Sequence, residues 1–216
     1  MDNKLISSKS KMFNRIQQLL PGSLVFAQDF SGDGTPEVVR QYLVKFSNEG
    51  LLTRLSQGVY LLPKKLGEHG DILPPVDEIA TALARRDKAR IIPTGEVALW
   101  KLGLTTQVPL NHVYITDGPS RVIKVQGPSA KVGYSIKFKH GSPKNFALRG
   151  KISSQVIQAL KVIGEKNLNN ELLGKIESLI MRENIDDLSH DLTIAPAWIS
   201  KLIKKSFAPY KTMKAQ

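Results

Sequence analysis

The sequence contains no cysteine. This absence excludes disulfide bonds, thiolate nucleophiles and cysteine-bound zinc. Histidines are also few, and they are scattered too widely to form a pair at the spacing of metal ligands. They are His69, His112, His140 and His190. We therefore predict no metal and no cofactor.

Long apolar runs are missing as well. No stretch approaches the roughly 18 residues that are needed to cross a bilayer. The amino-terminal segment carries lysines and an arginine but lacks the apolar core of an export signal. We therefore expect a cytoplasmic protein with no membrane partner. The 216 residues, 41% of them hydrophobic and 23% charged, suit an ordinary folded chain of two domains.

Acidic residues are scarce relative to basic ones. The chain has 31 Lys and Arg against 19 Asp and Glu, which gives a net charge of +12 and favours a polyanionic partner. The excess is +2 in residues 1–63, +7 in residues 64–150 and +3 in residues 151–216. Either the central part also binds nucleic acid or an acidic partner, or its charge is a solvated surface that favours solubility.

The sequence also lacks the groups on which enzymes that cleave nucleic acids depend. Metal-dependent nucleases use clustered carboxylates, but the carboxylate-x-lysine pattern occurs only at residues 2–4, and no acid lies beside Lys137 or Lys139. No Gly-rich phosphate loop is present. Asp117 and Gly118 are residue types of a turn. We predict no catalytic residue and expect that the chain is not an enzyme.

The most informative stretch is residues 35–63, TPEVVRQYLVKFSNEGLLTRLSQGVYLLP. Its first half predicts an amphipathic helix, because Pro36 and Gly50 suit the start and the stop of a helix and the apolar residues recur at helical spacing. These apolar residues are Val39, Leu43 and Phe46. Residues 52–55 and 59–62 flank a Ser-Gln-Gly turn and predict a β-hairpin.

The residues before this stretch complete a recognisable order. We predict a first helix that Ser8 or Ser10 caps and that runs through Leu20, a short extended piece at residues 24–26 and a brief helix at residues 27–30. Helix, strand, short helix, helix and hairpin are typical of a winged helix-turn-helix. The predicted fold class is therefore α+β, with a DNA-binding domain at residues 1–63 and double-stranded DNA as its partner.

A winged helix places its second main helix in the major groove of DNA. Arg and Gln can bind base edges through two hydrogen bonds, whereas Lys and Thr more often contact phosphates. The alternative for each residue is an ordinary solvated position on a surface helix. The predicted DNA contacts are Thr35, Arg40, Gln41 and Lys45 on the helix, with Arg54 and Gln57 on the wing.

The remaining chain predicts a linker, a second domain and a tail. Residues 64–75 are rich in Gly, Pro and Lys and predict the linker. Residues 76–207 predict a mixed α/β domain with a helical carboxyl-terminal part, and residues 208–216 form a basic tail. The expected helices are residues 77–86, 94–102 (capped by Thr94), 153–163, 171–182 and 195–205, and the expected strands are 90–92, 112–116, 121–125 and 134–140.

The last of these strands alternates apolar and basic residues. Ile136 and Phe138 alternate with Lys137 and Lys139, so one face of the strand should be buried and the other basic. A second basic surface is predicted from four residues: Arg121, Lys124, Lys137 and Lys139.

Several motifs now combine into a resemblance. They are EGLLTRLSQGVY in the hairpin, IIPTGEVALWKLGLTTQVPLNHVYITDGPSR, a KFKH strand and a terminal APAW. From about Met12 to Phe207 the chain resembles the AbiEi-type antitoxins of type IV toxin–antitoxin systems, in a branch recorded as an uncharacterised bacterial family. One departure is Gln57, where related sequences often carry a basic residue.

The resemblance implies a two-domain autorepressor that binds inverted repeats in the promoter of its own operon. It also implies a functional partner, a nucleotidyltransferase-like toxin, commonly countered without a stable complex. Two other classes of function stay open. One is a free-standing regulator whose basic second domain binds a ligand, a partner protein or DNA. The other is a nucleic-acid-processing enzyme, against which the missing acid cluster argues.

Overall fold

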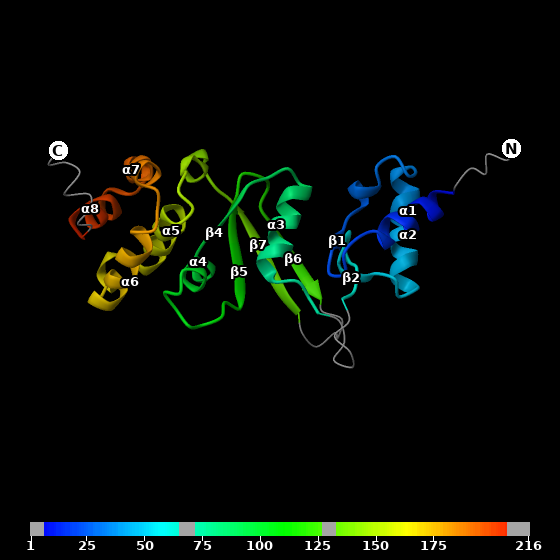
Figure 1. Ribbon diagram of the computed structural model, residues 1–216, viewed down its shortest axis with the longest axis horizontal. Coiled ribbons are helices and arrows are strands. Elements are labelled where there is room, and N and C mark those ends of the chain that lie inside the picture. Colours follow the sequence, from blue (N-terminus) through cyan, green and yellow to red (C-terminus); the bar gives the residue numbers. More distant parts are fainter. Residues whose placement is uncertain (1–6, 65–71, 127–132, 207–216) are drawn as a thin grey trace. The chain divides into compact units, whose positions relative to one another are not determined.

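The computed structural model describes residues 7–64, 72–126 and 133–206, and within them the fold is α+β, as predicted (Figure 1). The chain divides into two compact units. Unit 1 is Met1–Lys88 with Ile123–Ile136, and unit 2 is Ala89–Val122 with Lys137–Gln216. Residues 65–71 of the expected linker, and the expected basic tail, lie outside the described residues. No helix in the described ranges is long and apolar enough to cross a membrane.

The amino-terminal elements follow the predicted order. They are α1 (Ser8–Gln17), β1 (Leu24–Val25), the 3-10 helix η1 (Ala27–Phe30), α2 (Pro36–Asn48), β2 (Thr53–Ser56) and β3 (Val59–Leu61). β3 lies between β1 and β2 in an antiparallel sheet, where Leu24 pairs with Leu61 and Arg54 pairs with Tyr60. The local sequence therefore places each of these elements within a few residues.

Short-range signals start and stop these elements. Ser7, rather than the predicted Ser8 or Ser10, caps α1 by accepting a hydrogen bond from Ser10 N at 3.3 Å. Thr35 caps α2, as its Oγ1 accepts from Val38 N at 3.4 Å. Gly58 closes the β2–β3 hairpin with a φ of +69°, a conformation that favours glycine.

One apolar core holds the amino-terminal elements together. It consists of Met12, Ile16, Val25, Phe30, Val39, Leu43, Phe46, Leu52 and Tyr60. The three apolar residues that predict α2 are each at most 2% exposed in the structure. Burying a large apolar side chain stabilises the fold by about 1.5–3 kcal/mol. These contacts fix one face of α2 on the core, so its opposite face is directed outward.

Helix α3 (Val76–Arg86) of unit 1 confirms the helix expected at residues 77–86. Its side chains Ile79 and Leu83 are fully buried. Asp77 lies in its first turn and Arg85 in its last, the charge distribution that the helix dipole favours.

The second sheet has four strands in the spatial order β4-β5-β7-β6. They are β4 (Ile91–Pro93), β5 (Asn111–Thr116), β6 (Arg121–Gln126) and β7 (Gly133–His140). Gly141 N donates to Thr116 O at 2.9 Å, so the carboxyl ends of β5 and β7 lie together. The turn after β5 contains Asp117, which accepts from Arg90 Nε and Arg90 N at 2.7 Å each. Both hydrogen bonds lower the pKa of Asp117, and the one from the Arg90 guanidinium has the larger effect.

Helix α4 (Glu96–Lys101) begins later than predicted, and the prediction of Thr94 as its cap is wrong. Gly95, with a φ of +62°, precedes the helix and supplies no side-chain hydrogen bond. Thr94 N instead donates to Val113 O at 3.2 Å, which extends the pairing of β4 with β5. Thr94, the residue that sequence reasoning assigns to the helix start, therefore lies between the end of β4 and Gly95, with its N–H bonded to β5.

The carboxyl-terminal part of unit 2 is helical, as predicted. It contains the 3-10 helix η3 (Pro143–Ala147), α5 (Ser153–Ile163), the 3-10 helix η4 (Glu165–Asn167), α6 (Asn170–Ile180), α7 (Ile185–Ile194) and α8 (Ala197–Ser206). Sequence reasoning identifies α5, α6 and α8 but misses α7. Apolar residues of α4 to α8 form one core, to which α7 contributes Leu188 and Leu192.

Candidate nucleic-acid interface

Helix α2 presents a continuous exposed stripe, polar except for Val44, on the face opposite its buried residues. The exposed positions recur at helical spacing and include three of the predicted DNA contacts. The stripe consists of Glu37, Arg40, Gln41, Val44, Lys45 and Asn48. Because Val39, Leu43 and Phe46 occupy the core, packing in this domain leaves the stripe open. The structure thus brings Arg40, Gln41 and Lys45 onto one face.

Two ion pairs occupy the basic side chains of the stripe. Arg40 Nη2 lies 2.5 Å from Glu37 Oε1, and both side chains are more than 60% exposed. Lys45 Nζ lies 3.9 Å from Glu49 Oε1, which also lies 3.7 Å from Lys9 Nζ. Exposed pairs of this kind contribute little stability, typically about 0.2–1 kcal/mol. Both cations can therefore exchange their carboxylate for another anion at small cost.

The remaining predicted contacts lie at the helix start and on the hairpin. Thr35 is exposed at the amino end of α2, where its hydroxyl already serves as the cap. Arg54 and Gln57 are exposed on β2 and on the turn that follows it, whereas Leu55 and Val59 are buried. The register of β2 against β3 shifts between Arg54 and Ser56. Such irregularities re-aim side chains at the edges of sheets.

The second predicted basic surface is only partly brought together. In β7, Ile136 and Phe138 are buried, while Lys137 and Lys139 are exposed on the other face, as predicted. In β6, Lys124 is exposed, but Arg121 lies on the opposite face of the same strand. The Arg121 guanidinium stands 5.0 Å from the centre of the Phe138 ring. Arg121 is therefore separated from the other three residues by the sheet.

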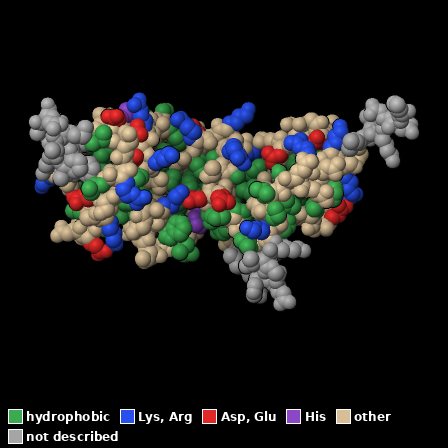
Figure 2. All heavy atoms as spheres, in the orientation of Figure 1, with side chains coloured by type: hydrophobic (Ala, Val, Ile, Leu, Met, Phe, Trp, Pro, Cys, Tyr) green, Lys and Arg blue, Asp and Glu red, His purple; other side chains and the backbone are tan. Residues whose placement is uncertain are grey.

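Basic side chains are spread widely across the molecule. Figure 2 shows Lys and Arg side chains scattered over the visible face, with acidic side chains between many of them. This distribution agrees with a charge excess that is not confined to residues 1–63, where it is only +2.

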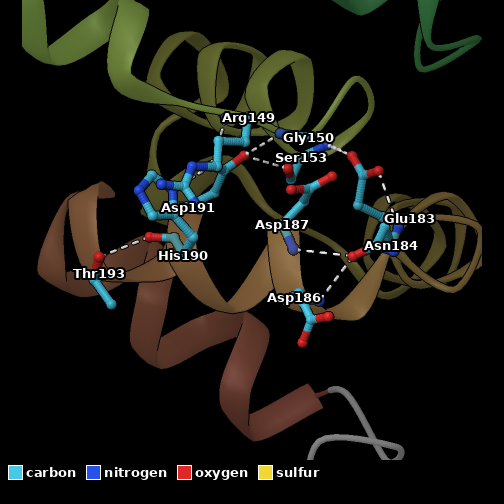
Figure 3. Close-up of polar contacts among 10 residues, drawn as sticks. All are labelled: Arg149, Gly150, Ser153, Glu183, Asn184, Asp186, Asp187, His190, Asp191 and Thr193. Carbon is cyan, nitrogen blue, oxygen red and sulfur yellow. Dashed lines mark hydrogen bonds and ion pairs between the residues drawn. The ribbon is translucent and has the colours of Figure 1, made fainter.

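Sequence reasoning misses a buried carboxylate cluster in unit 2 (Figure 3). Asp191 of α7 is 0% exposed. Its Oδ1 accepts from Arg149 N at 2.8 Å, and its Oδ2 accepts from Gly150 N at 3.0 Å and from Ser153 Oγ at 2.5 Å. Glu183 Oε2 accepts from Ile152 N and Ser153 N at 2.6 and 2.7 Å. Two acids thus satisfy the backbone donors at the start of α5.

The arrangement of this cluster is that of a structural support. His190 Nδ1 lies 3.2 Å from Asp191 Oδ1, whereas the Ser153 hydroxyl donates to the other carboxylate oxygen, Oδ2. A serine-hydrolase relay instead needs the histidine between the serine and the acid. A side chain at Gly150 would collide with Ser153 Oγ and with the Glu183 carboxylate. Among the described residues, no group of three His, Asp or Glu side chains could hold a metal ion.

A weak signal for the cluster exists in the sequence. Leu188 and Leu192 are buried and lie four residues apart, at helical spacing. They follow Asn184, which caps α7 by accepting a hydrogen bond from Asp186 N at 2.9 Å. The acid between the two leucines masks the helical pattern, because Asp191 occupies a core position that usually holds an apolar residue.

Residues 11–188 match the model of a Family of unknown function (DUF6088), and the chain belongs to that family. A search among curated proteins found no match.

Proposed function

We propose that this member of DUF6088 is a DNA-binding transcriptional regulator whose residues 7–63 act as a winged helix-turn-helix. The observation that carries the proposal is the exposed stripe of α2, with Arg40, Gln41 and Lys45 on one face and the helix's apolar residues in the core. A recognition helix needs this division, because its back must be held by packing while its front enters the major groove.

The stripe and the hairpin would have different tasks on DNA. Arg40 and Gln41 carry the side chains that can read guanine and adenine edges through paired hydrogen bonds. Lys45 and Thr35 suit phosphate contacts that set the position of the helix. Arg54 and Gln57 would lie along the backbone as a wing, and the uncharged Gln57 would make the weaker contact.

Glu37 places a negative charge on the proposed contact face, where it opposes phosphate binding. We expect Glu37→Gln to raise DNA affinity about two- to fivefold, because it frees Arg40 from an exposed ion pair. Fluorescence anisotropy with a labelled promoter fragment would measure the change. Glu171→Gln is the matched control, since Glu171 forms an exposed ion pair with Lys175 in unit 2. An unchanged or lower affinity for Glu37→Gln would place Glu37 away from the DNA.

The resemblance to AbiEi-type antitoxins extends the proposal to the biological role. The chain would repress its own operon by binding inverted repeats in the promoter. Unit 2 would support the neutralisation of a nucleotidyltransferase-like toxin, without a stable complex between the two proteins. The second candidate is a free-standing regulator, favoured by the open basic face of β7 with Lys137 and Lys139. A toxin reading frame beside the gene, and rescue of growth on co-expression, would favour the antitoxin.

The experiment that tests DNA binding is a footprint of the purified chain on the region upstream of its own gene, repeated over a range of salt concentrations. Phosphate contacts release counterions, so log affinity should fall linearly with log salt. Lys45→Ala should reduce that slope by about 0.9 without changing the protected sequence. Absence of any protected site at low salt would overturn the proposal.

A further inference from the structure

A small cavity in unit 2 lies outside the proposed DNA-binding face. It has a volume of about 240 Å³ and is formed by η3, α5 and the segment that joins α7 to α8. This volume lies below the roughly 300–1,000 Å³ of pockets for drug-sized ligands. Its polar lining includes Ser142, Lys144, Asn145 and Lys161, and Pro196 also lines it.

Two cations line this cavity without an acidic neighbour. Lys144 comes from η3 and Lys161 from α5, and the described lining contains no Asp or Glu. In the part of the chain that the structure describes, neither lysine forms an ion pair with a carboxylate. Lys161 Nζ donates to a neutral acceptor, Asn145 Oδ1, at 3.4 Å. The cavity is therefore electropositive.

The surroundings of Lys161 disfavour its charged form. Partial burial lowers the pKa of Lys161, and the nearby charge of Lys144 lowers it further. A bound anion would oppose this lowering, because an opposite charge within a few ångströms favours the protonated amine. The protonated form of Lys161 is thus disfavoured in the empty cavity and would be favoured by a negatively charged ligand.

The cavity also lies at the amino end of α8. Its lining residue Pro196 immediately precedes the first residue of the helix, Ala197. Pro196 has no side-chain acceptor, and the first turn of α8 contains no acidic residue. The amino end of a helix carries unsatisfied N–H groups and a partial positive charge that favours anions. The lining also contains the hydroxyl of Ser142, which can donate a hydrogen bond.

We propose that this cavity is a binding site for the phosphate group of a small free ligand, held by Lys144, Lys161 and the amino end of α8. Phosphate suits the site because its negative charge, about −2, balances the positive charges of two lysines and because its oxygens accept several hydrogen bonds. The site goes beyond the proposed DNA-binding function and does not depend on it, since every residue that forms it belongs to unit 2.

The test compares the thermal unfolding of the full chain in inorganic phosphate and in chloride at equal ionic strength. Both tryptophans, Trp100 and Trp198, lie in unit 2, so their fluorescence reports on the unit that contains the site. With phosphate at about ten times its Kd, the Tm should rise by about 3–6 °C. Lys144→Gln/Lys161→Gln should abolish this rise. Lys204→Gln, an exposed position near the other end of α8, should retain it.

The single variant Lys144→Gln provides a second test in case the double variant does not fold. In chloride it should match or exceed the wild-type Tm because one repulsion is removed, and in phosphate it should fall below the wild type. An equal phosphate effect in all variants, or none in the wild type, would overturn the proposal. The proposal would also be wrong if the Lys144→Gln/Lys161→Gln variant lost affinity for DNA while phosphate had no effect on the wild type. The two lysines would then belong to a surface that binds nucleic acid.

Discussion

Replacing Arg40 and Gln41 together with alanine is expected to lower affinity for the promoter site by about 10²- to 10³-fold. Each side chain can make a paired contact worth about 1–3 kcal/mol of discrimination between bases. Both are exposed on the stripe of α2, so neither substitution disturbs the core. Competition binding against the promoter site and against scrambled DNA of equal length would separate lost specificity from lost affinity.

The matched control for this variant is Arg182→Ala. It removes the same formal charge from an exposed position in unit 2 and should change promoter affinity by less than the experimental error. If the double variant instead loses affinity equally for promoter and scrambled DNA, its residues contact only phosphates. If it keeps both affinity and preference, α2 is not a recognition helix.

Asp191→Ala is expected to destabilise unit 2 by about 2–4 kcal/mol. The substitution leaves the buried donor Gly150 N and the partly buried donor Arg149 N without their acceptor, and an unsatisfied buried donor costs about 1–3 kcal/mol. The Ser153 hydroxyl loses its acceptor as well. Urea unfolding followed by tryptophan fluorescence measures this loss, because both tryptophans lie in unit 2.

Asp186→Ala on the same helix is the control. Asp186 is exposed in the first turn of α7, where the helix dipole gives a carboxylate about 0.3–1 kcal/mol. A loss for Asp191→Ala no larger than that of Asp186→Ala would mean that water replaces the carboxylate. Asp191→Asn separates shape from charge, since an amide has one acceptor oxygen where the carboxylate has two.

The amino-terminal elements were accessible to sequence reasoning because their signals are local. Thr35, Pro36, Gly50 and Gly58 each mark a boundary through their own backbone or capping preferences. The apolar spacing in between sets the buried face of α2. The exposed stripe then follows from helical geometry alone, which is why its basic and amide side chains can be grouped from the sequence.

The features that escaped prediction depend on distant parts of the chain. The sequence of β6 does not show which face of the strand is buried. The charged Arg121 packs on the Phe138 ring, whereas the apolar Val122 is 54% exposed. The position of β7 between β5 and β6 is set by tertiary pairing. Helix α7 is missed because its buried face contains Asp191, whose hydrogen-bond donors lie about 40 residues earlier in the chain. No local sequence pattern predicts that a buried carboxylate will accept its hydrogen bonds from such a remote segment.

That remote dependence has a consequence for biosynthesis. Arg149 N and its acceptor Asp191 are 42 residues apart, and ribosomes add about 5–20 residues per second. The segment at residues 149–153 therefore emerges roughly 2–8 s before the carboxylate that completes it. During that interval Arg149 N and Gly150 N are left to water, and only the acceptor of Ile152 N and Ser153 N, Glu183, emerges before Asp191. We expect a nascent chain stalled before residue 191 to be cut by proteases at this segment, and one stalled well beyond it to be protected.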